Sequence, residues 1–328
     1  MLRFQLLGDF QVTADDGTIR PVGSPKVAQT LALLLTHANE FVSSETLIRE
    51  LWGSAPPRSA LNTVQTYIHH ARRFLASEPG VPGAGAPSLA TRPGGYLLHV
   101  SEEVVDHKVF EAHRLRGAAA LRAGEHEAAA AHLGAAGTLW RGHPLSNTTT
   151  GPVLKSRVAH LEDRRIQVLE MSLEARAALG QHRDTVPELR VLVHDYPLHE
   201  GFHGHLITAL HLSGRRAEAL EAYRHARGVL RAELGLEPSA LVQRAHERVL
   251  ASGGRVTAPG PTPATGRLTE AVPAQRNGPL PARGRSGEAL SAPRATVTAM
   301  TGPRRGPRPF VVPRGGVRTP PPQPAHGS

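Results

Sequence analysis

Residues 58–77, with the sequence RSALNTVQTYIHHARRFLAS, predict a helix with one apolar and one polar face. At 100° per residue, one side gathers aliphatic side chains that we expect to pack into a core: Leu61, Val64, Ile68, Ala71 and Leu75. The opposite side carries Asn62, Thr66, His69 and Arg73, flanked by Gln65 and His70, with Arg72 nearer the edge of the apolar stripe. No acidic residue interrupts the segment. Amide and guanidinium groups on such a face suit the base edges of a DNA major groove.

The elements around this helix determine its context. Ser24-Pro25 predicts the start of a helix that runs to about residue 38, and a second helix begins at Ser43 or Ser44 and ends at Gly53. An exposed loop, 53–57, leads into the polar helix, and strands at 89–92 and 95–98 follow around a Pro93-Gly94 turn. Helix, helix, loop, helix and hairpin is the order of a winged helix-turn-helix domain, which we place at residues 1–100.

Two further features belong to this α+β domain. Alternation of apolar and polar residues at 2–6 predicts a half-buried strand, and the turn at 15–17 predicts a second short strand after it. Arg92, at the tip of the hairpin, is a candidate for contacting phosphate or the minor groove. A polar helix face is more often simply solvated, so it is the order of the elements that favours DNA binding here.

Residues 103–251 predict an all-α domain. Helices are expected at about 107–124, 125–140, 152–179, 182–195, 199–213, 215–234 and 239–251, with Asp106 as the cap of the first. Two similar turns, around Gly180 and Gly214, are 34 residues apart, which is the period of tetratricopeptide repeats. Stacked helix pairs of that kind leave a concave surface for a partner. A plain helical bundle is the alternative.

Residues 252–328 are rich in Gly, Pro and Arg and predict a disordered tail, and residues 81–87 predict a shorter flexible segment. The net charge of the chain is +10, but residues 251–328 contribute eleven Arg against two acidic residues. The rest of the chain is therefore almost neutral. We expect the tail to add affinity for any DNA through counterion release, with little specificity.

Several functional classes are disfavoured by the composition. The chain has no cysteine, which excludes disulfides and thiolate chemistry, and its first residues resemble neither a secretory signal nor a membrane anchor, so we expect a cytoplasmic protein. No Gly-Lys-Ser/Thr phosphate loop occurs, and we expect no cofactor and no metal. His199, His203 and His205 leave an enzyme with a metal site as an alternative, although solvated histidines explain them better. A second alternative is an interaction adaptor whose winged domain no longer binds DNA.

The segments that carry a family resemblance run in order through residues 2–251. They are FQLLGDFQV, SPKVAQTLALLLTHAN, VSSETLIRELWGSAPPRSALNTVQTYIHHARRFL, TRPGGYLL, LWRGHPL and YPLHEGFHGHLITALHLSGRRAEALEAYRHARGVLRAELGLEPS. With these segments the chain resembles the Streptomyces antibiotic regulatory protein family, whose members activate clusters of secondary-metabolite genes.

The resemblance implies an OmpR-like winged helix followed by a tetratricopeptide-like bacterial transcriptional activation domain. It places Asn62, Gln65, Thr66, His69, Arg72 and Arg73 on the recognition helix, and Arg92 and Gly94 in the wing. The turn of Trp52, Gly53, Ser54, Pro56 and Pro57 matches the loop that faces RNA polymerase in OmpR-like activators. Family members bind direct repeats near the −35 element as subunits placed side by side, and recruit RNA polymerase. The ATPase module of larger relatives is not expected here.

Overall fold

The computed structural model describes residues 1–76 and 86–252. Most of the predicted flexible segment at 81–87 lies outside the described residues. The predicted disordered tail at 252–328 also lies outside them, apart from Ser252.

A two-stranded antiparallel sheet opens the chain. Strand β1 (Arg3–Gln5) pairs with β2 (Gln11–Thr13), with Phe4 opposite Val12 and both side chains fully buried. The predicted alternation at 2–6 is therefore confirmed. The second strand, however, precedes the turn at 15–17, and after the turn only a single bridge forms, between Thr13 and Ile19.

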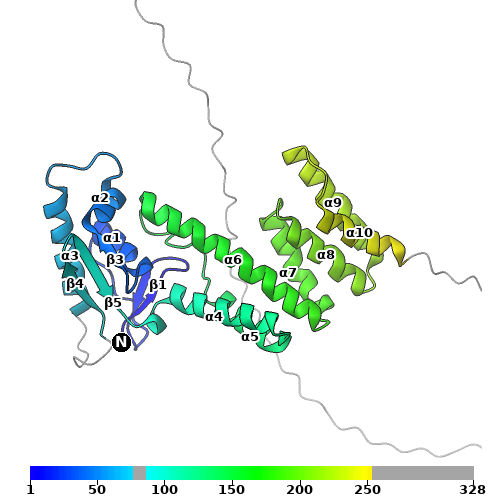
Figure 1. Ribbon diagram of the computed structural model, residues 1–328, viewed down its shortest axis with the longest axis horizontal. Coiled ribbons are helices and arrows are strands. Elements are labelled where there is room, and N and C mark those ends of the chain that lie inside the picture. Colours follow the sequence, from blue (N-terminus) through cyan, green and yellow to red (C-terminus); the bar gives the residue numbers. More distant parts are fainter. Residues whose placement is uncertain (77–85, 253–328) are drawn as a thin grey trace, which may run out of the picture. The chain divides into compact units, whose positions relative to one another are not determined.

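The winged helix follows (Figure 1). Helix α1 (Pro25–Thr36) begins at Ser24, whose hydroxyl caps the Val27 N–H, and α2 (Ser44–Trp52) begins after Ser43, which caps Thr46. Helix α3 spans Ala60–Ala76. Strands β4 (Ser88–Arg92) and β5 (Gly95–His99) form the predicted hairpin, and a strand that the sequence did not predict, β3 (Phe41–Ser43), pairs with β5 to give the order β3-β5-β4.

One predicted core residue of α3 is wrong. Leu61 is 48% exposed, and Ala60 is buried in its place beside Val64, Ile68, Ala71 and Leu75. The helix begins at Ala60 rather than Arg58, so Leu61 lies in its first turn, and the buried stripe begins at Ala60 instead. The other four core residues of this helix are confirmed.

Seven helices form the second half of the described chain. Their bounds are α4 (Asp106–Arg122), α5 (His126–Thr138), α6 (Pro152–Ala178), α7 (His182–Asp195), α8 (Glu200–Leu212), α9 (Arg216–Leu234) and α10 (Ala240–Ala251), after a short 3-10 turn at Glu102–Val104. These bounds agree with the predicted helices to within a few residues. Helix α6 begins against α1 and α2 and ends against α7 and α8, so it runs from the winged helix into the helical region (Figure 1).

The predicted repeat appears as a repeated turn. Gly180 and Gly214 both adopt left-handed backbone, with φ of +74° and +80°. In each turn the N–H after the glycine donates to the carbonyl five residues earlier, from Gln181 to Arg176 and from Arg215 to Leu210. This pattern ends one helix and reverses the chain into the next, because only glycine adopts the left-handed conformation without strain.

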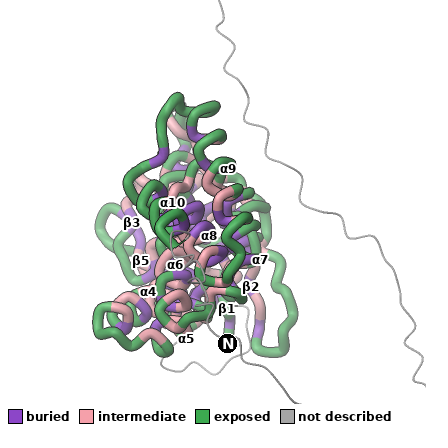
Figure 2. Tube along the Cα trace, turned by 90° about the vertical axis from the view of Figure 1, so that its right-hand side faces the viewer, coloured by how far each residue is buried: buried purple, intermediate pink, exposed green. Residues whose placement is uncertain are grey.

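Three apolar clusters hold the described residues together. One surrounds α8, where the tube in Figure 2 is largely buried, and another lies among α4, α5 and α6. The third is the core of the winged helix, and it includes Leu145, Leu154 and Val158 from the helical half of the chain. The two predicted domains therefore share part of one hydrophobic core.

Candidate nucleic-acid interface

The exposed side of α3 carries the polar residues that the sequence predicted for it. Asn62, Gln65, Thr66, His69 and Arg73 are all exposed, and we call these five the recognition face. The Thr66 hydroxyl donates to the Asn62 carbonyl at 3.1 Å, which leaves its oxygen free to accept. Among the residues that the structure describes, Arg73 has no carboxylate partner. Helical periodicity alone produces this arrangement, because the aliphatic residues of α3 turn inward.

Arg72 has different contacts from its neighbour Arg73. Its Nε donates to the Leu89 carbonyl at 2.8 Å and its Nη2 to the Thr91 hydroxyl at 2.7 Å. Both acceptors lie on β4, so this guanidinium fixes the hairpin against α3. We assign Arg72 to positioning the wing relative to the recognition face.

The wing presents its turn to solvent. Arg92 and Gly94 are exposed, and Gly94 has a φ of +80°, which favours glycine after Pro93 in a tight hairpin turn. The Gly94 carbonyl accepts the Ser44 N–H at 2.9 Å, which ties the turn to the start of α2. At Gly95 the strands approach so closely that a Cβ would lie 2.2 Å from the Val42 carbonyl oxygen. The base of the wing is therefore rigid.

The loop between α2 and α3 is anchored at one end and exposed at the other. Trp52 is half-buried against the winged-helix core, and the Gly53 N–H closes α2 on the Arg49 carbonyl. Ser54, Pro56 and Pro57 are exposed. This places a stiff, proline-rich surface directly before the recognition helix.

A buried carboxylate missed by the sequence analysis holds α2 against α6. Glu50 is 2% exposed, and its oxygens accept the backbone N–H groups of Gly151, Val153 and Leu154 at 2.5, 2.9 and 2.9 Å. Gln29 donates to the same carboxylate at 2.8 Å. The N-terminus of α6 is thus capped by a side chain 101 residues earlier. Glu50 falls between Leu47 and Leu51 on the buried side of α2, and a charge on an apolar face was the available signal.

A second carboxylate joins the first sheet to α4. The predicted cap role of Asp106 is wrong: Val105 occupies the cap position, and Asp106 instead accepts the N–H groups of Leu6 and Leu7 at 2.8 and 2.9 Å. Burial raises the pKa of the Asp106 carboxyl, although these N–H groups and Arg141 favour its charged form. The name domain interface is used for three groups of contacts. They are those of Glu50 with Gln29 and α6, those of Asp106 with the first sheet, and those around the end of α1, which involve His37, Asn39, Glu40, Lys108 and Arg157.

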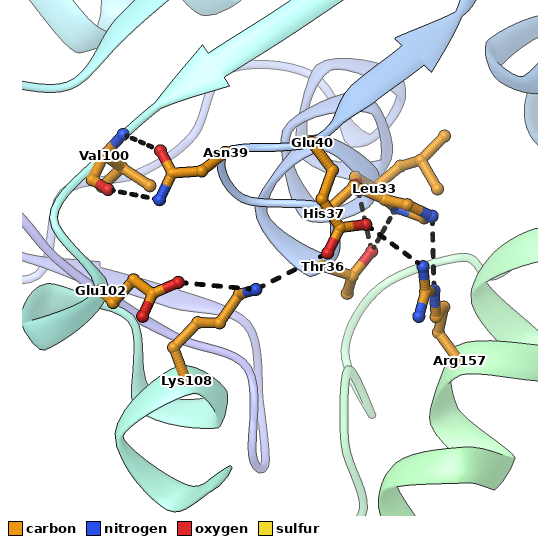
Figure 3. A network of polar contacts seen from close by, with 9 residues as sticks. All are labelled: Leu33, Thr36, His37, Asn39, Glu40, Val100, Glu102, Lys108 and Arg157. Carbon is orange, nitrogen blue, oxygen red and sulfur yellow. Dashed lines mark hydrogen bonds and ion pairs between the residues drawn. The ribbon is translucent and has the colours of Figure 1, made fainter. Parts of the chain in front are cut away.

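Polar contacts also surround the end of α1 (Figure 3). Glu40 lies 3.7 Å from both Lys108 of α4 and Arg157 of α6, and the Arg157 Nε contacts the His37 ring at 3.3 Å. Burial lowers the pKa of His37. Asn39 exchanges two hydrogen bonds with the backbone of Val100, at 2.9 and 3.0 Å. The winged helix is therefore joined to α4 and α6 by ion pairs as well as by packing.

The histidines that suggested a metal site have other surroundings. His203 is 1% exposed and its Nε2 lies 2.9 Å from the Pro197 carbonyl oxygen. Within residues 1–76 and 86–252, no group of three or more His, Cys, Asp or Glu side chains is arranged to hold a metal ion. In the same part of the chain, no helix is both long and apolar enough to cross a membrane.

Comparison with known proteins agrees with this geometry. Residues 21–98 match the family described as "Transcriptional regulatory protein, C terminal", and residues 105–250 match the bacterial transcriptional activator domain. Regulatory protein DnrI of Streptomyces peucetius is 36% identical over 262 residues, covering 79% of this chain and 96% of that protein. The chain belongs to the Streptomyces antibiotic regulatory protein family.

Other relatives of this family member extend the comparison. Transcriptional regulator RedD of Streptomyces coelicolor is 36% identical over 226 residues, covering 69% of this chain and 64% of RedD. The solved structure of Mycobacterium tuberculosis EmbR, in complex with a low-affinity phosphopeptide, superposes with a TM-score of 0.71 at 33% identity, covering 76% of this chain and 65% of that one. These relatives are regulatory proteins rather than enzymes. The chain is a DNA-binding transcriptional activator of the antibiotic regulatory type, with an OmpR-like winged helix and a helical activation domain.

Proposed function

We propose that this activator binds direct repeats near the −35 element of promoters in a secondary-metabolite gene cluster. The observation that carries the proposal is the recognition face of α3, whose five polar side chains are exposed on a helix without an acidic residue. Asn and Gln match adenine in the major groove, and Arg matches guanine. The helix supplies both kinds of group within three turns.

The wing supplies the second contact. Arg92 is exposed at the hairpin tip, and Arg72 holds that hairpin against α3, so a duplex bound by α3 would meet Arg92 at the backbone or in the minor groove. Direct repeats one helical turn apart would place two subunits side by side on the same face of the duplex.

We further propose that residues 1–100 form the DNA-binding domain and residues 103–251 the activation domain, acting in the cytoplasm. The loop of Trp52, Gly53, Ser54, Pro56 and Pro57 would contact RNA polymerase holoenzyme, because its exposed part lies next to the recognition helix. The domain interface would hold the activation domain at a fixed orientation to the promoter.

DNase footprinting with the full chain tests this proposal. On promoters of the neighbouring gene cluster, we expect one continuous protected segment that contains both copies of a repeat, with their centres about one helical turn apart. Protection that shows no preferred position on these promoters would contradict the proposal and would favour the adaptor alternative.

A further inference from the structure

A cavity of about 160 Å³ lies where the winged helix meets the helical region. Thr36 and Glu40, at the end of α1 and just after it, form one wall, and His107, Lys108 and Phe110 of α4 form another, with Arg157 of α6 closing it. Figure 3 shows Lys108 and Arg157 approaching Glu40 from the two helices. A cavity of about 150 Å³ accommodates benzene. The space therefore suits a small ring or a short chain with one polar group.

His107 is the unexplained residue of this cavity. Its side chain lines the space and is only 8% exposed, yet neither ring nitrogen has a hydrogen-bond partner among the described residues. A buried donor and acceptor without partners cost free energy comparable to a lost hydrogen bond. Burial, with the positive charges of Lys108 and Arg157, lowers the pKa of His107 to about 3. The ring is thus neutral and has one N–H to donate.

Positive charge exceeds negative charge around the cavity. Lys108 and Arg157 each lie 3.7 Å from the carboxylate of Glu40, and Lys108 also lies 3.9 Å from the carboxylate of Glu102. Glu111 also lines the cavity, but Arg114 neutralises it through hydrogen bonds of 2.7 and 2.6 Å. Two further lining residues, Arg164 and His160, add donors and no negative charge. Arg164 has no carboxylate partner among the described residues, so the positive charges here exceed the negative charges by one, which favours an anionic ligand.

The remaining walls are apolar. Phe110 is fully buried and Leu161 is 9% exposed, and both line the cavity. We propose that the cavity binds a small monocarboxylate with a short apolar body. The carboxylate contacts Lys108 and Arg157 and accepts a hydrogen bond from the His107 N–H. The apolar body packs on Phe110 and Leu161.

Ligand binding here would stabilise the domain interface. The walls belong to both halves of the described chain, so an occupant that contacts Lys108, Arg157 and the end of α1 holds them together. Anything that binds only the folded state raises its apparent stability. The effect is measurable without DNA and does not depend on the proposed promoter binding.

Isothermal titration calorimetry of the full chain with benzoate, benzamide and inorganic phosphate tests the proposal. Benzoate should bind saturably and raise the melting temperature, whereas the neutral benzamide and the phosphate, which lacks an apolar body, should bind at least about ten-fold more weakly. On titration with benzoate, the ring signals of His107 should shift in NMR spectra. Equal affinity for the three probes, no saturable binding of benzoate, or unchanged His107 signals would overturn the proposal.

A pair of variants on α6 locates the site. Arg157→Gln should weaken benzoate binding about ten-fold or more, because a charge-assisted hydrogen bond is lost. Lys155→Gln, which removes an exposed charge two residues away and outside the cavity lining, should leave it unchanged. Circular dichroism confirms that both variants are folded. Equal weakening by the two substitutions would show a general charge effect and overturn the assignment.

Discussion

The recognition face and the domain interface use the same residue types for opposite purposes. Gln65 is exposed on α3, whereas Gln29 is 1% exposed and donates to both the carboxylate and the carbonyl of Glu50. Asn62 is exposed, whereas Asn39 is paired twice with Val100. The interface residues have their partners inside the protein, and the recognition face has donors and acceptors available for a ligand outside it.

The contrast is sharpest within one dipeptide. Arg72 is bonded to β4, and Arg73, one residue later and about 100° further round the helix, has no carboxylate partner among the described residues. Residue type therefore does not assign a role, whereas the placement of a residue on its helix does. Interface substitutions should change stability, and recognition-face substitutions should change DNA binding.

The largest effect is expected from Glu50→Gln. The substitution replaces one carboxylate oxygen by an NH2 group, which donates and cannot accept the N–H groups of Gly151, Val153 and Leu154. The free energy of unfolding should therefore fall by about 3 kcal/mol. Urea unfolding measures this. Glu45→Gln, on the exposed side of the same helix, is the matched control and should cost less than about 1 kcal/mol. Similar losses in both variants would contradict the role assigned to Glu50.

Arg73→Ala tests the other side of the comparison. We expect a loss of roughly 1–3 kcal/mol in binding to the promoter site, with relaxed preference at one base pair, while unfolding is unchanged. Binding to single-base variants of the site measures both quantities. A loss that is uniform across all sequences would assign Arg73 to phosphate, and a loss of stability would remove it from the recognition face.

The third effect is a dependence of stability on pH. His107 is neutral in the folded chain, with a pKa of about 3, while an unfolded histidine binds a proton below about 6.5. Its contribution to the free energy of unfolding is complete above pH 6.5 and is lost as the pH falls towards 3, so at pH 5.5 the protein should be less stable by roughly 1 kcal/mol than at high pH. Lys108, Arg157 and His37 strengthen the shift, and Glu40 and Glu111 share the cavity.

Urea unfolding at pH 7.5 and 5.5 checks this prediction. Burial also lowers the pKa values of His37, His203 and His205, so the whole protein should lose more than His107 alone contributes. His107→Gln should reduce the difference between the two pH values. An undiminished difference would show that His107 does not contribute to it.

The smallest effect is expected from Leu61→Ala. Because Leu61 is 48% exposed, its truncation should change the free energy of unfolding by less than about 0.5 kcal/mol. Ile68→Ala on the same helix, where the side chain is 1% exposed, should cost at least about 2 kcal/mol. A similar loss of stability for Leu61→Ala and Ile68→Ala would show that Leu61 is part of the core.

Local patterns in the sequence were sufficient for most elements. The caps of α1 and α2, the apolar stripe of α3 and the Pro93-Gly94 turn are contained in short segments, so periodicity and turn chemistry predict them. The recognition face followed from the same periodicity. Strand β3 was missed because three residues show no alternation that distinguishes them from a loop.

Contacts between distant segments could not be predicted. Glu50 caps a helix 101 residues later, and Asp106 binds N–H groups 100 and 99 residues earlier. Neither partner has a signature in its own segment, because a backbone N–H is present at almost every residue. The hydrogen bonds of Arg72 to β4, 17 and 19 residues later, could not be predicted either, because backbone carbonyls and hydroxyls that could accept them occur throughout the chain.

Fluorescence anisotropy of the full chain with promoter DNA, and with shuffled DNA of the same composition, over a salt series, tests the central claim most directly. If the recognition face contacts base edges, the promoter should bind more tightly and the preference should persist as salt rises, because base contacts are less sensitive to counterion release than phosphate contacts. Equal affinities for the two DNAs, lost together with added salt, would show that this face of α3 is only solvated.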